Sequence, residues 1–523
     1  MARGLLGKFA TVGGATMASR VLGFAREALV GAALGAGPVA DAFYTAFALP
    51  NLFRRIFAEG AFNTAFVPLF AKELEGEGGK ARAQVFAVQV VSVLVPILAV
   101  LSIVCIVAMP AVVFLNAPGF ADTPEKFDLT VTMARIMFPY LFALSLVAML
   151  SGVLNSLRRY FLAAFVPVLL NVILVATLLF VLWRGVDDVT TGLWLAWGVF
   201  AAGLAQLLLL VWGTRREGFL IRPARPRLTP GVRQLLVLMG PAVLTGGVIQ
   251  INLFIGQMIA SLQDGARALL NYADRLNQLP LGVIGIAIGV VLLPELSRAL
   301  KAGRREEAER LQDRSLEFAL ALTLPAAVAF VTVPQPLVAL VYERGQFDAE
   351  VTRLTALALA AYAAGLPAYV LIKVFQPAFF ARLDTKTPFR FSLVMVVVNV
   401  LGSLALFPSL SPYGLGHVGI AFATAVSAWV NVALLAGAAW RSGDFRPARA
   451  TLRRVSAIVA ASLAMGATLL GVEALMPNAL LAPDLAVKLA RFAVLAGTGA
   501  VVFFGLAWVT GGIDRSMLSA VKR

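Results

Sequence analysis

Fourteen long apolar segments, separated by short loops that hold most of the charge, constrain this chain more than any other feature. A bilayer core about 30 Å thick takes ~20 apolar residues per helix. The chain is 60% hydrophobic and 14% charged, whereas soluble domains are about 45–50% apolar and about 25% charged. We therefore predict an all-α polytopic membrane protein with about fourteen transmembrane helices. They are expected near 8–35, 38–72, 83–116, 127–156, 161–184, 191–213, 235–262, 268–300, 315–342, 350–381, 388–409, 414–440, 452–475 and 485–511.

The remaining composition excludes several classes of site. Cys105 is the only cysteine and lies in an apolar run, so an intrachain disulfide is impossible and a buried structural thiol is expected. His417 is the only histidine, which argues against a histidine-based metal site. We predict no metal and no cofactor. The first apolar stretch is broken by Arg20 and Arg26, which does not fit a cleavable signal peptide.

Loop charge alternates along the chain and predicts the orientation in the membrane. Four turns carry no Lys or Arg: 36–40, 117–124, 410–417 and 477–484. The basic connections are 72–82, 157–160, 214–233, 301–314 and 441–454. Because cytoplasmic loops of membrane proteins hold the excess of Lys and Arg, these connections and both termini are expected in the cytoplasm. The net charge of +16 is therefore no sign of nucleic-acid binding.

An internal repeat divides the chain. "AFVPLFAKEL" (65–74) precedes "VLLPELSRAL" (291–300) by 226 residues, and the same offset places Asn51 on Asn277. An offset of 228 matches Pro139 with Pro367 and Asn171 with Asn399. Six helices per repeat give both halves the same orientation. This predicts two lobes related by a pseudo-two-fold axis along the membrane normal, with a cavity between them.

The repeat and the loop charges give four predicted regions. Residues 1–213 form a six-helix lobe, 214–234 a basic amphipathic cytoplasmic linker, and 235–446 a second six-helix lobe. Residues 447–523 hold an extra helix pair outside the repeat, which we expect to form a groove for a lipid tail.

Several charged residues fall inside the apolar segments, where a charge costs at least a few kcal/mol and nearly always faces a protein interior or a wet cavity. They are Arg20, Arg26, Glu27, Asp41, Arg54, Arg55, Glu59, Asp274 and Arg275, with single charges at Arg135 and Lys373. Arg55 and Glu59, four residues apart, fit an internal ion pair that stabilises the bundle. For Arg135 and Lys373, the sequence does not distinguish a structural role from a functional one.

The other arginines favour a ligand. The first nine charges leave a surplus of one positive charge, and all the cations are Arg rather than Lys. Arginine binds phosphate or carboxylate through a planar fork and stays charged when partly dehydrated. We therefore predict an anionic substrate, with phosphate as the first candidate.

Three stretches carry a family resemblance: "SRVLGFARE" (19–27), "DAFYTAFALPNLFRRIFAEGAFNTAFVP" (41–68) and "YADRLNQLPLGVIGIAIGVVLLP" (272–294). They resemble the MurJ (MviN) family of lipid II flippases, in the multidrug/oligosaccharidyl-lipid/polysaccharide exporter superfamily. The resemblance implies fourteen helices and transport of the undecaprenyl-pyrophosphate-linked peptidoglycan precursor from the inner to the outer leaflet, by alternating access around an Arg-lined cavity. It implies no catalytic residue and no enzyme activity.

The resemblance also assigns residues and partners. The candidate substrate-binding set is Arg20, Arg26, Glu27, Asp41, Asn51, Arg54, Asp274, Arg275 and Gln278. Gln278 stands where some members have a glutamate, so this chain lacks the acidic charge that those members have at the position. The expected partners are lipid II and the bilayer, without nucleic acid, and other cell-wall synthesis proteins are further candidates. The expected location is the bacterial cytoplasmic (inner) membrane, with both termini inside.

Rival functions remain open at this stage. A flippase for another polyprenol-linked oligosaccharide would share the pyrophosphate, whereas a drug exporter of the same superfamily would suit a cavity with net carboxylate. A membrane-embedded polyprenyl-phosphate transferase would need acidic clusters for a divalent metal. The adjacent acidic pair Asp187–Asp188 lies in a short outer turn, where solvated loop charge is the simpler interpretation.

Overall fold

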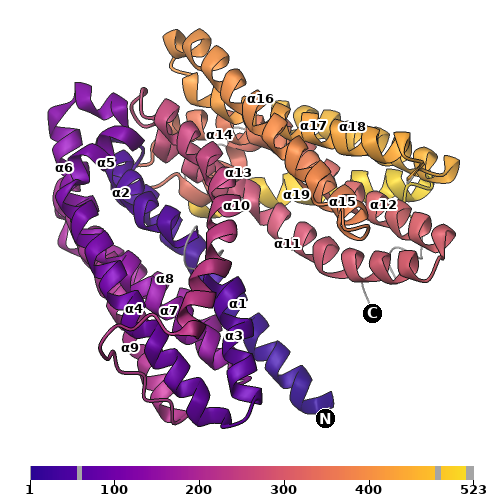
Figure 1. Ribbon diagram of the computed structural model, residues 1–523. Helices are drawn as coiled ribbons and strands as arrows, with labels where there is room; N and C mark the ends of the chain where they lie inside the picture. Colours follow the sequence, from indigo (N-terminus) through magenta and orange to yellow (C-terminus); the bar gives the residue numbers. More distant parts are fainter. Residues whose placement is uncertain (1, 56–61, 444, 477–483, 514–523) are drawn as a thin grey trace. The chain divides into compact units, whose positions relative to one another are not determined.

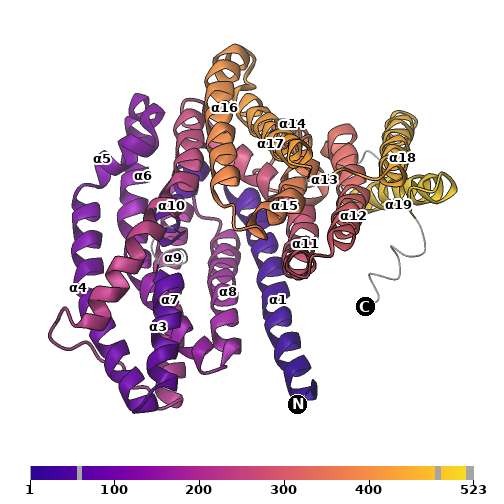
Figure 2. The same cartoon turned by 45° about the vertical axis from the view of Figure 1, so that its right-hand side comes forward.

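The structure is a computed structural model that describes residues 2–55, 62–443, 445–476 and 484–513. These residues form α-helices and two short 3-10 helices, with no strand (Figures 1 and 2). The helices of the first half are α1 Ala2–Leu34, α2 Pro38–Arg54, α3 Asn63–Glu75, α4 Gly79–Val107, α5 Met109–Asn116, η2 Pro118–Asp122, α6 Pro124–Met137, α7 Pro139–Ser156, α8 Tyr160–Arg184, α9 Asp188–Arg216 and α10 Pro230–Ala260. Those of the second half are α11 Ala266–Lys301, α12 Arg305–Thr332, α13 Pro334–Tyr342, α14 Ala349–Ala363, α15 Leu366–Phe380, α16 Lys386–Leu410, η3 Ser411–Tyr413, α17 Gly416–Arg441, α18 Arg449–Ala474 and α19 Leu485–Val509.

The all-α prediction is confirmed, and each predicted segment coincides with one or two helices. Four segments consist of two helices each: 83–116, 127–156, 315–342 and 350–381. In each of them, a proline lies in the first turn of the second helix: Pro110, Pro139, Pro334 and Pro367. Proline has no N–H to donate to the preceding turn, yet it suits the first turn of a new helix, so the chain restarts there.

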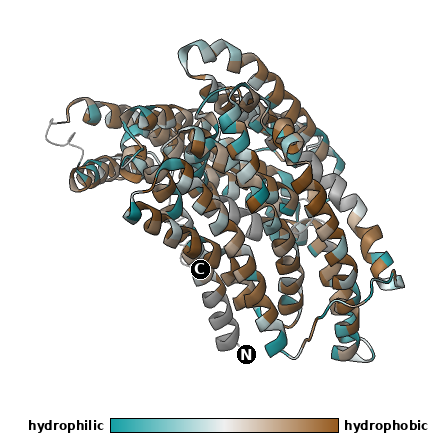
Figure 3. Cartoon of the chain, turned by 90° about the vertical axis from the view of Figure 1, so that its left-hand side faces the viewer, coloured by the Kyte–Doolittle hydropathy of each residue, from teal (hydrophilic) through white to brown (hydrophobic). Residues whose placement is uncertain are grey.

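The outer surfaces of the helices suit lipid. Within the described residues, ten helices are long and apolar enough to cross a membrane; the count of fourteen stays a prediction. Hydrophobic residues run along most helices in Figure 3. Large apolar side chains such as Trp183, Leu401 and Val501 are 78%, 61% and 74% exposed, an arrangement that needs a hydrocarbon environment. Cys105 is buried and free, as predicted.

The chain forms two compact units. One comprises residues 1–268 with 344–347, and the other residues 269–343 with 348–523. The predicted division at 213, 235 and 447 stays a prediction. In the first unit, α7, α8 and α9 lie side by side, α1 packs on α8, and α10 packs against α3, α4 and α5.

Aromatic rings fill part of the first unit's core. Phe66 stacks on Phe62, Phe70 and Phe86 with ring centroids 5.0–5.9 Å apart. Phe219, from the predicted linker, is fully buried against Phe70. The chain between α9 and α10 contains no helix, and its Ala224 N–H donates to Ser92 Oγ of α4 at 2.7 Å. One buried ring therefore anchors a largely polar connection to the helices beside it.

The second unit has two hydrophobic clusters. One joins α11, α12, α15 and α17 around Leu320, Val374 and Leu435. The other joins α12 to the last two helices around Ile458, Leu469 and Phe503. The final helix pair therefore packs on the unit through α12, and α19 also packs on α13.

Candidate functional site

A polar stripe on α2 holds one of the predicted binding arginines. Tyr44, Phe47, Asn51 and Arg54 are spaced by three, four and three residues, which places them on one face of a helix. Asn51 Nδ2 donates to the Phe47 carbonyl at 2.8 Å, and Arg54 Nε donates to Asn51 Oδ1 at 3.3 Å. Asn51 is thus held by the helix backbone and in turn orients the Arg54 guanidinium.

A buried cluster on α1 contacts the Tyr44–Phe47 end of this stripe. Arg26 is 8% exposed and Glu27 is 1% exposed, and they form an ion pair. Tyr44 Oη donates to Glu27 Oε2 at 2.7 Å, so α1 and α2 are joined at this point. The Arg26 guanidinium carbon also lies 5.8 Å from the centre of the Phe47 ring. Arg26 and Glu27 therefore neighbour the stripe that continues to Arg54.

Asn171 of α8 completes the cluster. Arg26 Nη1 donates to Asn171 Oδ1 at 3.0 Å, and Asn171 Nδ2 donates to the Ser19 carbonyl of α1 at 3.0 Å. A buried cation held by one carboxylate and one neutral amide retains positive character that an anion can use. Asn171 entered the sequence argument only through the repeat, so its role beside Arg26 was missed.

The other predicted binding residues lie on α1 and α11. Arg20 is exposed on α1. Arg275, Asp274 and Gln278 lie on α11 in the second unit. There Arg275 is half-buried, and Gln278 Nε2 donates to the Asp274 carboxylate.

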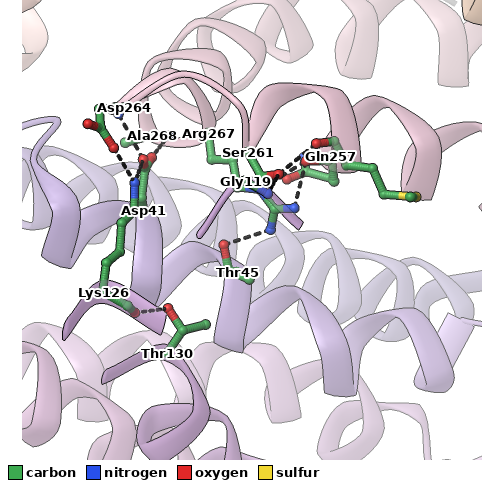
Figure 4. A network of polar contacts seen from close by, with 12 residues as sticks. Asp41, Thr45, Gly119, Lys126, Thr130, Gln257, Ser261, Asp264, Arg267 and Ala268 are labelled. Carbon is green, nitrogen blue, oxygen red and sulfur yellow. Dashed lines mark hydrogen bonds and ion pairs between the residues drawn. The ribbon is translucent and has the colours of Figure 1, made fainter. Parts of the chain in front are cut away.

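Asp41 has a different environment. Its carboxylate is fully buried and accepts the backbone N–H groups of Gly265 at 2.8 Å and Ala268 at 3.0 Å (Figure 4). It also accepts from Lys126 Nζ at 2.8 Å. A carboxylate that binds the orphan N–H groups at the start of α11 both satisfies them and complements the helix dipole. Asp41 is therefore held by α6 and the α10–α11 turn rather than by the Arg26 cluster.

Two buried cations beside Asp41 were missed by the sequence argument. Lys126, 4% exposed, also binds Asp264 at 2.9 Å. Arg267, 1% exposed, donates to Thr45 Oγ1 at 2.6 Å and to Asn116 Oδ1 at 2.9 Å. The predicted helices began at residues 127 and 268, one position after each cation, so both were treated as loop residues.

Phe120 of η2 lies against both cations. Its ring centre is 4.1 Å from Lys126 Nζ and 5.3 Å from the Arg267 guanidinium carbon. Arg267 Nε also donates to the Gln257 carbonyl at 3.0 Å, which joins the end of α10 to the start of α11. We refer to Asp41, Lys126, Asp264 and Arg267 as the α11 capping network.

The remaining charges have local roles or fall outside the described residues. Glu59 lies outside them, so the predicted Arg55–Glu59 pair stays a prediction; Arg55 itself is exposed. Arg135 is exposed and its Nε donates to the Ile106 carbonyl at 3.2 Å. Lys373 is half-buried on α15.

The acidic pair at 187–188 marks the start of a helix. Asp187 is exposed and caps α9, accepting from Thr190 Oγ1 at 2.6 Å and from Thr190 N at 3.0 Å. These two hydrogen bonds hold the pKa of the Asp187 carboxyl below its usual value. Asp188 accepts from Gln346 Nε2 at 2.6 Å. Both carboxylates therefore accept local hydrogen bonds at the start of α9, in keeping with their loop position.

Comparison with known proteins identifies the family. The model of the family "Lipid II flippase MurJ" matches residues 30–489. The chain belongs to the MurJ family. It is 51% identical over 522 residues to a protein of Rhizobium meliloti (strain 1021) named "Probable lipid II flippase MurJ", covering 99% of this chain and 96% of that protein. It is 36% identical over 506 residues to "Lipid II flippase MurJ" of Burkholderia cenocepacia, covering 96% of each.

Solved structures agree on the fold. A lipid II flippase MurJ in an inward closed conformation matches with a TM-score of 0.77 at 22% identity, covering 95% of this chain and 98% of the other. An inward-facing multidrug resistance MATE family transporter of the MOP superfamily matches with a TM-score of 0.62 at 17% identity, covering 81% and 95%. At these identities the matches establish the shared fold of the superfamily. The family resemblance expected from the sequence is confirmed, and with the ten apolar helices it indicates a multi-pass inner-membrane protein.

Proposed function

We propose that this chain is a flippase that carries lipid II from the inner to the outer leaflet of the bacterial cytoplasmic membrane, and thereby serves cell-wall synthesis. The full-length match to relatives named for this activity, 51% identical over 99% of the chain, carries the proposal. The family consists of transporters, so the chain is not an enzyme. The likeness to a drug exporter extends to the fold alone and lends no support to a cationic substrate.

The experiment that tests this function follows lipid II itself. Cells depleted of their own flippase are expected to regain lipid II at the outer leaflet when they express this chain, with the lipid chemically unchanged. A transferase would instead convert the lipid to another species. Unaltered lipid II that stays in the inner leaflet despite normal membrane levels of this chain would contradict the proposal.

The pyrophosphate of lipid II is the natural ligand for the predicted arginines. In the first unit, the buried Arg26 and the Asn51-oriented Arg54 support this assignment. A phosphate can replace Glu27 or Asn171 as the partner of Arg26, and such an exchange of partners can shift the balance between two conformations. Arg20 and Arg275 enter the proposal through the family motif, and we expect each of them to contact the lipid during the transport cycle.

The last helix pair is proposed to hold the lipid tail. A cavity of about 310 Å³ lies between α12, α13, α18 and α19. Leu322, Phe330, Leu469 and Phe503 are among its apolar lining residues. Such a surface suits a polyprenyl chain, which has no polar group to satisfy. The position of these helices outside the repeat agrees with a role that the two lobes do not share.

Filling the tail groove is expected to impair flipping without preventing insertion. A side chain at Gly499 would point toward Leu469 and Met465, so Gly499→Leu occupies space in the groove. A side chain at Gly505, also on α19, meets nothing within 4 Å, so Gly505→Leu is the matched control. Flipping per membrane-inserted molecule should fall for the first variant only. Equal activity of both, or full flipping by a folded chain truncated at Arg446, would rule out the tail groove.

Cysteine labelling tests the orientation predicted from the loop charges. Because Cys105 is the only thiol, Cys105→Ser gives a clean background. Asp187 and Arg225 are both exposed, so a cysteine at either position is open to a membrane-permeant reagent. An impermeant reagent added to intact cells should label Asp187→Cys and spare Arg225→Cys. The reverse pattern would invert the topology and the direction of transport.

A further inference from the structure

A second basic site lies at the ends of α7, α8 and α9 in the first unit. A cavity of about 620 Å³ opens there, with Val12 of α1 on its wall. Arg158, Arg159 and Arg216 supply its cations. None of these residues belongs to the predicted lipid II set or to the α11 capping network.

The cavity carries uncompensated positive charge. Arg159 Nε pairs with Glu217 Oε1 at 3.0 Å. Arg158 and Arg216 form no ion pair with any residue that the structure describes, so three guanidinium groups face one carboxylate. The Arg216 guanidinium carbon lies 5.3 Å from the centre of the Trp212 ring, which can stabilise the cation without neutralising it. The site therefore has a surplus of two positive charges.

Arg158 occupies a backbone position that favours glycine. Its φ is +60°, and it follows the end of α7, where Arg158 N donates to the Asn155 carbonyl at 2.9 Å and Arg159 N to the Leu154 carbonyl at 2.8 Å. This pair of bonds defines a Schellman cap, whose left-handed residue is usually glycine. An L-residue with a Cβ is strained in this conformation, and only Asn or Asp tolerate it well.

The end of α9 provides the comparison. Gly218 N donates to the Arg215 carbonyl and Phe219 N to the Thr214 carbonyl, both at 2.9 Å, and Gly218 has a φ of +78°. The same cap thus has glycine at one helix end and arginine at the neighbouring end. Backbone strain of this kind often occurs at ligand-binding positions. At position 158 that side chain is a guanidinium aimed at a cavity with surplus positive charge.

The depth of the cavity matches the interface between lipid and water. Tyr160, Phe161 and Trp212 are 40%, 50% and 51% exposed at the ends of their helices, and Tyr and Trp favour this zone of the bilayer. A Cβ at Gly213 would come within 2.5 Å of Leu162 Cδ1, so the glycine lets α8 approach α9 closely. The cavity therefore places cationic groups, which suit a lipid headgroup, next to apolar residues, which suit the acyl chains below it.

We propose that this cavity binds the phosphodiester headgroup of an anionic phospholipid of the surrounding leaflet. Arg158 and Arg216 would contact the phosphate oxygens, for which the planar guanidinium is well suited. Basic pockets at the ends of membrane helices are known to recognise anionic headgroups. By the predicted topology the lipid belongs to the cytoplasmic leaflet. The site is separate from the proposed transport of lipid II and does not depend on it.

Native mass spectrometry of the full chain in detergent tests the assignment. Phosphatidylglycerol is expected to bind more tightly than phosphatidylcholine. Arg158→Asn combined with Arg216→Gln should weaken phosphatidylglycerol binding roughly 30-fold and leave phosphatidylcholine binding unchanged, since each cation near an anionic lipid contributes roughly five- to sixfold in affinity. Glycerol 3-phosphate serves as the soluble probe. If it displaces phosphatidylglycerol at comparable concentration, the site takes free phosphate and the lipid assignment is wrong.

Matched variants distinguish the loss of this binding site from a change in net charge and from misfolding. Arg225→Asn with Arg227→Gln removes two exposed arginines outside the cavity and should leave phosphatidylglycerol binding unchanged. An equal loss of phosphatidylglycerol affinity in both double variants would show that overall charge causes the effect, and would overturn the proposal. Asn tolerates the left-handed conformation, so Arg158→Asn should keep or raise the thermal unfolding midpoint. Should the double variant unfold, Arg216→Gln alone is decisive, with a roughly fivefold loss expected and an unchanged affinity contradicting the site.

Discussion

Lysine at position 54 is expected to lower lipid II transport by roughly tenfold or more, although the protein still inserts and accumulates normally. Arg54 donates through Nε to Asn51 Oδ1, and this bond sets the orientation of its guanidinium plane. A lysine keeps the charge but has neither the Nε donor nor the planar fork that binds two phosphate oxygens at once. The measurement is rescue of flippase-depleted cells, normalised to membrane abundance of the variant.

The neighbouring arginine provides the control. Arg55 is exposed, and Arg55→Lys makes the same chemical change one residue further along the chain. It should support growth like the unchanged protein. Full rescue by Arg54→Lys would show that transport does not require bidentate phosphate binding by Arg54. Full rescue by alanine at each of Arg20, Arg26, Arg54 and Arg275 would show that other residues bind the pyrophosphate.

Methionine at position 126 is expected to destabilise the protein by about 3–5 kcal/mol, the usual effect of breaking a buried ion pair from one side. Lys126 Nζ binds Asp41 at 2.8 Å, and the two side chains are 2% and 0% exposed. Methionine has a similar volume, so packing is largely kept while the Asp41 carboxylate loses its cation. Thermal unfolding in detergent and membrane abundance should both report the loss.

Two further variants identify the cause of that loss. The Asp264 side chain is 80% exposed, so Asp264→Asn should change stability little although it also contacts Lys126. Asp41→Asn combined with Lys126→Met removes both buried charges and should recover part of the stability, because the two effects are coupled. If the double variant is as unstable as the sum of the single changes, the buried pair is not the source of the effect.

The sequence predicted the location of the helices well because the signal is local. A run of about twenty apolar residues can be recognised without knowing what it contacts. The breaks inside four of the segments were not predicted, although prolines such as Pro139 and Pro334 lie directly after the breaks. A proline in an apolar run permits either a kink or a restart, and the neighbouring helices select between them.

The candidate site was predicted in part. Arg26, Glu27 and Arg54 stood out because a charge within an apolar segment is costly wherever it finally lies. Their partners could not be predicted, since Asn171 is 145 residues from Arg26 and carries no charge. Asp41 was grouped with the arginines by family motif, whereas its contacts in the structure are to Lys126 and the start of α11.

What the sequence alone determined was the environment of the chain: an all-helical membrane protein of the MurJ family, with intramembrane arginines suited to a phosphate-bearing lipid. Composition and periodicity suffice for this because the bilayer acts as a solvent on each segment separately. Only the tertiary structure decided which cations are bound and which remain available. Lys126 pairs with Asp41, 85 residues away in the chain, and Arg267 donates to Thr45, 222 residues away. Arg158 has a strained backbone beside a cavity instead. The free energy of a buried charge depends on the donors, acceptors and solvent that folding places around it. No local pattern in the sequence shows which groups these are.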